Sequence, residues 1–225
     1  MTTVKTKELF DLSHTLAKDF LSTCEYPWLA LPGIKDLVLS LGSTLPAEEY
    51  DNPEPGIWIA KDVKIAKTAT ICPPTIIGKG TEVRPGAYIR GSVLVGEGCV
   101  VGNSCELKNV ILFDGVQVPH FNYVGDSMLG KGVHLGAGAI CSNLRSDKKN
   151  VVIKGENLQI ETGLRKLGAI LGDGVEIGCG AILNPGTVIG KNSTVYPLTL
   201  ARGIYPGNSI VKNTNIVVSK EEFFD

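Results

Sequence analysis

Aliphatic residues recur every six positions along most of this chain. The first run has ten of them at strict multiples of six: Ile59, Ile65, Ile71, Ile77, Val83, Ile89, Val95, Val101, Leu107 and Phe113. The spacing returns later in the chain: Leu129, Leu135, Leu171, Ile177, Leu183, Ile189 and Val195. A period of six matches neither the 3.6 residues of a helical turn nor the alternation of a simple strand. Each hexad therefore predicts one flat face of a coil whose aliphatic residue points inward, and three faces close one turn of a triangular parallel β-helix.

Helical patterns precede the hexads. Lys5 to Thr23 carries apolar residues at helical spacing and predicts an amphipathic helix that docks on the coil. A second helix is expected over Gly33 to Leu41. We expect three regions: a helical N-terminal segment and linker over 1–56, the β-helix over 57–200 and a C-terminal tail over 201–225.

The hexads break twice. Over 116–123 the phase is lost, which predicts a segment that bulges out of the coil. Over 141–168 the break is longer and rich in lysine and arginine. Loops that leave a rigid scaffold often carry binding and catalytic residues, so both breaks are candidate functional segments.

Bulk composition excludes several classes. The net charge of −1 over 225 residues gives no electrostatic footprint for nucleic acid. The six cysteines form no CxxC pair, which favours reduced thiols in a cytoplasmic protein. The chain has no apolar run of about 18 residues and its first residues lack an apolar core, so we expect neither a membrane span nor secretion.

His120 is the first candidate for chemistry. A neutral imidazole accepts a proton near pH 7, and this one lies in the first break. The alternative is a surface or packing histidine. Arg84 and Lys108 have a similar alternative as solvated corner charges, while Tyr123 could pack under the loop and Asn143 could cap a turn.

Seven short motifs favour the functional interpretation, because they resemble a known family at preserved spacing. They are Arg84-Pro85-Gly86-Ala87, Gly102-Asn103, Glu106-Leu107-Lys108, His120, Tyr123-Val124-Gly125-Asp126, Gly136-Ala137-Gly138 and Asn143. In them the chain is similar to the C-terminal acetyltransferase domain of the bifunctional sugar-1-phosphate nucleotidylyltransferase/acetyltransferases, which make UDP-N-acetylglucosamine. The implied fold is an all-β, left-handed parallel β-helix of hexapeptide repeats, preceded here by the short α-helical segment.

The resemblance implies an acetyl transfer from acetyl-CoA to the amine of a hexosamine 1-phosphate, either glucosamine or galactosamine 1-phosphate. His120 is the implied general base, and Asn143 orients the sugar near its amine. The implied phosphate ligands are Arg84, Lys108 and Tyr123, because arginine can donate two hydrogen bonds to one phosphate. Lys149 or Lys166 supplies another cation.

The resemblance also implies how the donor binds and how the protein assembles. Ala137 and Cys179 match positions that contact CoA, although the common enzyme has serine where Cys179 stands. No metal is expected, and the active site is expected to form between the subunits of a homotrimer. The Gly-rich Leu-x-x-Gly-x-Gly-Thr-Arg loop of the nucleotidylyltransferase half is not in this sequence.

Two other functions share this type of coil. A zinc hydratase of the γ-carbonic anhydrase kind needs three histidines, and the sequence offers only His14, His120 and His134, the first of them in the predicted N-terminal helix. A noncatalytic or sugar-nucleotide-binding relative is the second alternative, left open by Cys179 and by Leu144, which replaces a tyrosine of the common enzyme.

Overall fold

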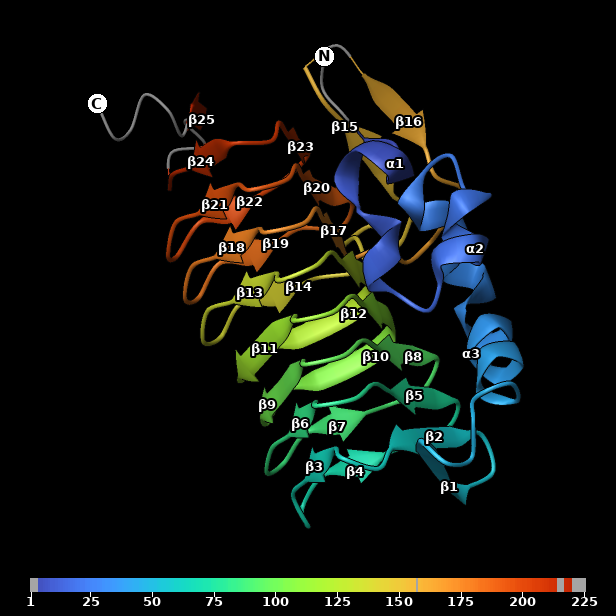
Figure 1. The fold of residues 1–225 in the computed structure, drawn as a ribbon. Coiled ribbons are helices and arrows are strands. Elements are labelled where there is room, and N and C mark those ends of the chain that lie inside the picture. Colours follow the sequence, from blue (N-terminus) through green and yellow to red (C-terminus); the bar gives the residue numbers. More distant parts are fainter. Residues whose placement is uncertain (1–3, 157, 214–216, 220–225) are drawn as a thin grey trace.

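The computed structural model describes residues 4–156, 158–213 and 217–219. Within them the chain winds into a parallel β-helix with three faces, which confirms the predicted fold class (Figure 1). The first face carries the strands β3 (Lys64–Ile65), β6 (Glu82–Val83), β9 (Val100–Asn103), β11 (Gln117–His120), β13 (His134–Leu135), β18 (Glu176–Ile177), β21 (Thr194–Val195) and β24 (Ser209–Val211), and β25 (Val217–Ser219) pairs antiparallel with β24.

The other two faces share a pair of long strands, β10 (Glu106–Leu112) and β12 (Tyr123–Leu129), which run around the corner between them. One of these faces, here called the open face, also has β4 (Thr70–Ile71), β7 (Tyr88–Ile89), β14 (Ile140–Cys141), β19 (Ile182–Leu183) and β22 (Leu200–Ala201). The other, the covered face, has β1 (Tyr50–Glu54), β2 (Ile57–Ala60), β5 (Thr75–Ile77), β8 (Val93–Val95), β17 (Ala169–Leu171), β20 (Thr187–Ile189) and β23 (Ile204–Tyr205).

The hexad residues form the inner core. Ile77, Val95 and Leu107 are buried, and each pairs with a residue about one coil away. Ile77 pairs with Val95, which is 18 residues later, whereas Leu107 pairs with Val124, which is 17 residues later. Coils of three hexads therefore stack directly, and a few are one residue shorter.

The predicted excursion over 116–123 is wrong, and the one-residue difference explains why. Residues 117–120 form β11, which pairs in parallel with β9 and β13 inside the wall of the coil. Buried residues at six-residue spacing continue through it: Leu112, Val118 and Val124. This run starts five residues after Leu107 because the corner at Asn109, with a φ of 54°, is one residue shorter. The hexad phase is shifted rather than lost.

The longer break is a true departure from the coil. After β14 the chain leaves the wall, forms the antiparallel hairpin β15 (Val152–Lys154) and β16 (Gln159–Glu161), and returns at β17. The coil closes beneath this insertion, since Leu129 pairs with Leu171.

The single N-terminal helix predicted over Lys5 to Thr23 is wrong. The segment is broken into α1 (Thr6–Leu9), η1 (Leu12–His14) and α2 (Lys18–Ser22). The physical reason is that the backbone of this segment bonds to the coil. The Leu9 carbonyl accepts a hydrogen bond from the Asp173 amide at 3.1 Å, and the Asp11 amide donates one to the Asp173 carboxylate at 2.7 Å. A continuous helix would have used these groups internally.

Two further helices follow, η2 (Pro27–Gly33) and α3 (Ile34–Gly42), and α3 confirms the second predicted helix. The helices lie along the covered face and make a second core with its outward side chains (Figure 1). These outward residues are all buried: Ile76, Leu94, Ile111, Met128, Ile170 and Val188. Among the described helices, none has the length and apolarity needed to cross a membrane.

Candidate functional site

The predicted site residues lie along two corners of the coil. Arg84, His120, Ala137 and Cys179 lie at the corner between the first face and the open face. Successive coils are in contact there: the carbonyl of His120 accepts from the amide of Gly138 at 3.0 Å, and the carbonyl of Ala137 accepts from the next coil at 2.8 Å. The structure therefore brings together the proposed base and the two proposed CoA positions.

His120 ends β11, and its side chain is exposed. Its backbone amide donates to the side-chain oxygen of Asn122 at 3.1 Å, and this buried asparagine holds the corner. The imidazole has no hydrogen bond to any described residue, so both ring nitrogens are open to a ligand. Arg84 lies two coils away and is paired with Glu82 at 3.2 Å.

A hydrogen-bonded cluster, here called the Asp126 cluster, occupies the corner at the other end of the open face. It consists of Lys108, Asn109, Tyr123, Asp126 and Asn143. The Asp126 carboxylate accepts from Lys108 Nζ at 2.9 Å, from Asn109 Nδ2 at 3.0 Å and from Asn143 Nδ2 at 2.5 Å. Asn143 Nδ2 also donates to the Tyr123 hydroxyl at 3.1 Å. Asp126 thus joins Lys108 to Asn143, and Asn143 joins Tyr123 to both. The motif Tyr123-Val124-Gly125-Asp126 contains this aspartate, but no role was predicted for it.

Asp126 organises this corner from inside the protein. The residue is 4% exposed and has a φ of 48°, and its carbonyl accepts from the amide of Gly168 at 2.7 Å, where the long insertion returns to the coil. A sequence signal for it exists, because Lys108 lies 18 residues before it and Asn143 lies 17 residues after it. Residues one coil apart are stacked neighbours.

The cluster fixes which atoms face a ligand. The amide group of Asn143 has two N–H donors, and both are engaged, so its carbonyl oxygen is left as an acceptor. The Tyr123 hydroxyl accepts a hydrogen bond, which leaves its own proton available as a donor. Burial raises the pKa of Tyr123, and the nearby carboxylates of Asp126 and Glu106 raise it further, so this hydroxyl keeps its proton at neutral pH.

Among the described residues, the two loop lysines make no side-chain contact with the cluster, although Lys166 is next to Leu167, whose amide donates to the Asn143 carbonyl at 3.0 Å. Lys149 and Lys166 are exposed on the insertion. The Lys149 amide donates to Asp147 at 3.1 Å, and Lys166 forms an isolated bridge with Leu144. Neither ammonium contacts the Asp126 cluster in the part of the chain that the structure describes.

The histidines do not converge. Nε2 of His14 lies 2.9 Å from the Nζ of Lys131, and Nδ1 of His134 lies 3.0 Å from Glu176. Within residues 4–156, 158–213 and 217–219 there is no group of three or more histidine, cysteine, aspartate or glutamate side chains that could hold a metal ion.

Known proteins match the coil. A family model described as the GMPPB C-terminal domain matches residues 71–165. A "Bifunctional sugar-1-phosphate nucleotidylyltransferase/acetyltransferase" of Sulfurisphaera tokodaii is 39% identical over 92 residues, which is 41% of this chain and 23% of that protein. A "Bifunctional protein GlmU" of Methanococcus maripaludis is 36% identical over 117 residues, which is 52% of this chain and 28% of that protein.

Among the solved structures that match is that of a hexapeptide transferase family protein from Anaplasma phagocytophilum. It has 16% identity and a TM-score of 0.48, with 75% of this chain and 82% of that chain covered. The chain spans about a quarter of the length of the curated relatives it matches. The chain is similar to the bifunctional sugar-1-phosphate nucleotidylyltransferase/acetyltransferases over part of its coil, as its motifs predicted.

Proposed function

We propose that this protein transfers an acetyl group from acetyl-CoA to the amine of a hexosamine 1-phosphate, glucosamine or galactosamine 1-phosphate, in UDP-N-acetylhexosamine biosynthesis. The main support is a pairing of two features at the ends of one face. At one corner lies an exposed histidine whose ring bonds to none of the described residues, and at the other lies the Asp126 cluster with the amide oxygen of Asn143. The name of the Sulfurisphaera relative includes acetyltransferase, which supports the same reaction class.

The proposed chemistry uses His120 as general base. The amine nitrogen attacks the thioester carbonyl carbon and forms the C–N bond, while the imidazole takes a proton from that nitrogen. The C–S bond then breaks, and CoA leaves as the thiolate, which takes the proton back from the imidazolium. Base catalysis of this kind contributes about 10²- to 10⁴-fold to a rate, and holding amine and thioester together adds to it.

The proposed donor site runs along the corner of His120. Ala137 is one coil beyond His120, and Cys179 is one coil beyond Ala137. A CoA molecule that lies along this corner can therefore contact Cys179 and Ala137 and bring its thioester to His120. Cys179 is exposed. A thiol donates a weaker hydrogen bond than a hydroxyl, and we therefore expect Cys179→Ser to tighten acetyl-CoA binding.

The proposed acceptor site uses Asn143, Tyr123, Lys108 and Arg84. The Asn143 carbonyl oxygen receives a hydrogen bond from the amine, and the Tyr123 hydroxyl donates to the phosphate. Arg84 and Lys108 lie at opposite ends of the open face, a span of about six residues or roughly 20 Å at the rise of an extended chain. His120 and Asn143 lie at the same two opposite corners. One phosphate can therefore contact both Arg84 and Lys108, and one amine both His120 and Asn143, only when two chains contribute to one site.

We propose that the copies meet through the open face, in the homotrimer that the resemblance implies. Exposed apolar side chains mark this face and its edge: Tyr88, Phe121, Ile140, Ile182, Leu198 and Leu200. The first face instead presents Lys64, Gln117 and Glu176, and the covered face is filled by helices. An apolar stripe beside a polar face is suited to another copy of the chain. Ile182→Glu should convert the trimer to monomer in light scattering, whereas Glu176→Gln on the first face should not.

Release of the CoA thiol tests the reaction. Wild-type protein with acetyl-CoA and either hexosamine 1-phosphate should release thiol, and His120→Ala should lower the rate by at least about 100-fold. His134→Ala is the matched control, since this histidine is bound to Glu176 on the first face. If wild type and His120→Ala are equally inactive with both sugars, the acetyl transfer is refuted, and binding of UDP-N-acetylglucosamine to both would favour the noncatalytic alternative.

A further inference from the structure

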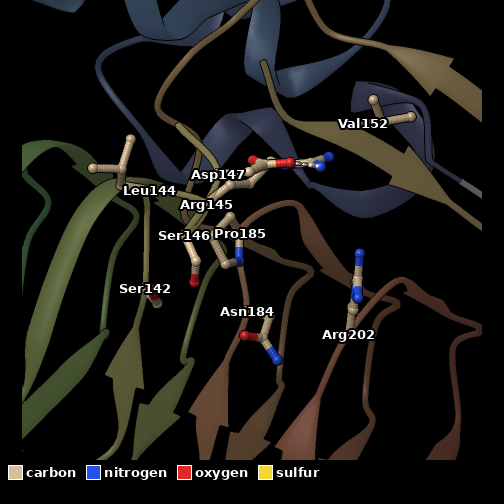
Figure 2. Close-up of a pocket in the computed structure, with 9 residues that line it drawn as sticks. All are labelled: Ser142, Leu144, Arg145, Ser146, Asp147, Val152, Asn184, Pro185 and Arg202. Carbon is tan, nitrogen blue, oxygen red and sulfur yellow. Dashed lines mark hydrogen bonds and ion pairs between the residues drawn. The ribbon is translucent and has the colours of Figure 1, made fainter. Parts of the chain in front are cut away.

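A polar pocket lies beyond the Asp126 cluster, under the long insertion. Its volume is about 330 Å³. The insertion contributes Ser142, Arg145 and Ser146, and the next two coils contribute Asn184 and Arg202 (Figure 2). None of these side chains has a role in the proposed transfer.

Arg145 is held in a fixed orientation. Its Nε and Nη2 donate to the two carboxylate oxygens of Asp147 at 2.9 and 2.6 Å. This pairing, helped by the Lys149 amide, lowers the pKa of Asp147 to about 2, so the carboxylate stays charged. A guanidinium has five N–H donors, and three remain for a ligand after these two are used.

Arg202 brings a second guanidinium from the corner after β22. The side chain is exposed, and Figure 2 shows it rising from its coil toward the inserted segment. Its backbone amide donates to the Tyr205 hydroxyl at 3.2 Å, which fixes the corner. The guanidinium has no acidic partner among the described residues. With Arg145 neutralised by Asp147, the pocket keeps one positive charge.

We propose that this pocket binds a phosphomonoester carried on a sugar ring. Arginine donors in a planar fork match a phosphate, and the uncompensated charge of Arg202 favours a dianionic group. Ser142, Ser146 and Asn184 supply donors and acceptors for ring hydroxyls. The volume lies at the small end of ligand pockets, which suits one phosphorylated ring.

Two sources of that chemistry are tested separately. A free sugar phosphate is represented by glucose 1-phosphate, which has no amine and cannot be acetylated. The ribose 3′-phosphate of CoA is represented by comparing CoA with dephospho-CoA. Inorganic phosphate tests whether the sugar ring contributes.

Calorimetric titration of the full chain measures the site. If the ligand is a sugar phosphate, Arg202→Gln and Arg145→Gln should each weaken binding of glucose 1-phosphate by at least tenfold, because each loses charge-assisted hydrogen bonds. If the ligand is the 3′-phosphate of CoA, each variant should instead reduce the affinity ratio of CoA to dephospho-CoA by at least tenfold. Arg202→Lys should recover part of the loss. Lys67→Gln, an exposed lysine near the far end of the coil, removes the same charge and should change nothing.

The proposal is overturned if both arginine variants bind these ligands as the Lys67→Gln control does, or if inorganic phosphate binds as tightly as glucose 1-phosphate. Lys108→Gln separates this site from the acceptor site. If Lys108→Gln abolishes binding while Arg202→Gln keeps it, the ligand belongs to the acceptor site and the pocket proposal fails. Binding that depends on Arg202 in a protein without acetyl transfer would refute only the proposed function.

Discussion

Replacing Asp126 with asparagine should destabilise the protein far more than an ordinary surface substitution. The carboxylate is buried and accepts from three donors, Lys108, Asn109 and Asn143. An amide of the same shape keeps only one oxygen and turns an NH₂ group toward donors, so at least one donor loses its acceptor.

The magnitude follows from the exposure of each partner. The side chain of Lys108 is 30% exposed, so water replaces much of the lost ion pair, and this part costs about 1 kcal/mol. A buried donor left unpaired costs about 1–3 kcal/mol, and Asn109 and Asn143 are half-buried, so the middle of that range, about 2 kcal/mol, applies. Together these give a loss of about 3 kcal/mol, which for a chain of this size lowers the Tm by about 6–12 °C.

Thermal and urea unfolding, followed by circular dichroism, measure the loss. Asp51→Asn is the control, because Asp51 is an exposed aspartate in β1. In a Lys108→Met background the effect of Asp126→Asn should fall by about 1 kcal/mol, since the ion pair is already absent. A Tm shift for Asp126→Asn as small as that of Asp51→Asn would refute the view that this carboxylate holds the corner.

Three other expectations follow from the coil. Gly102→Ala places a Cβ 1.7 Å from the Pro119 carbonyl oxygen of the next coil, so it should lower the free energy of unfolding in urea by more than about 3 kcal/mol. Gly98→Asn is the control and should cost little, because Gly98 has a φ of 62° and open space around its Cβ position. Equal losses for the two variants would contradict this reasoning. Exposed Cys179 should react first with a thiol reagent, and Cys179→Ser should remove that fast phase. Burial raises the pKa of the Cys141 thiol from 9.0 to about 12, so the protein should lose stability as the pH rises from about 9 to 12, and Cys141→Ala should weaken that dependence.

The inner core could be predicted because it depends on local spacing. A hexad residue such as Ile77 or Val95 points inward whatever lies elsewhere in the chain, so its period identifies the coil. The predicted break at 116–123 is wrong because one missing residue at the corner after Leu107 resembles a loss of pattern over the following strand. The buried run through Val118 shows that the pattern continues.

The site could be predicted only in part. Motifs identified Lys108, Tyr123 and Asn143 as ligands. Asp126 ends one of these motifs, but its role in joining Lys108 to Asn143 depends on contacts between successive coils. The pocket that contains Arg202 could not be predicted from the sequence, because the path of the insertion over the coil depends on how its hairpin packs.

The second core has a consequence for synthesis. The N-terminal helices leave the ribosome before the coil, yet their second core includes Met128, Ile170 and Val188, and the Asp11 amide bonds to a carboxylate 162 residues later. Contacts of such sequence separation form slowly, because most of the chain must exist before they can close. Helix α3 can pack as soon as β5, β8 and β10 have been translated, whereas the stretch from Leu9 to Asp11 bonds to Asp173 and has to wait for the coils that follow the insertion. The covered face therefore closes from one end to the other, in the order in which its coils are made.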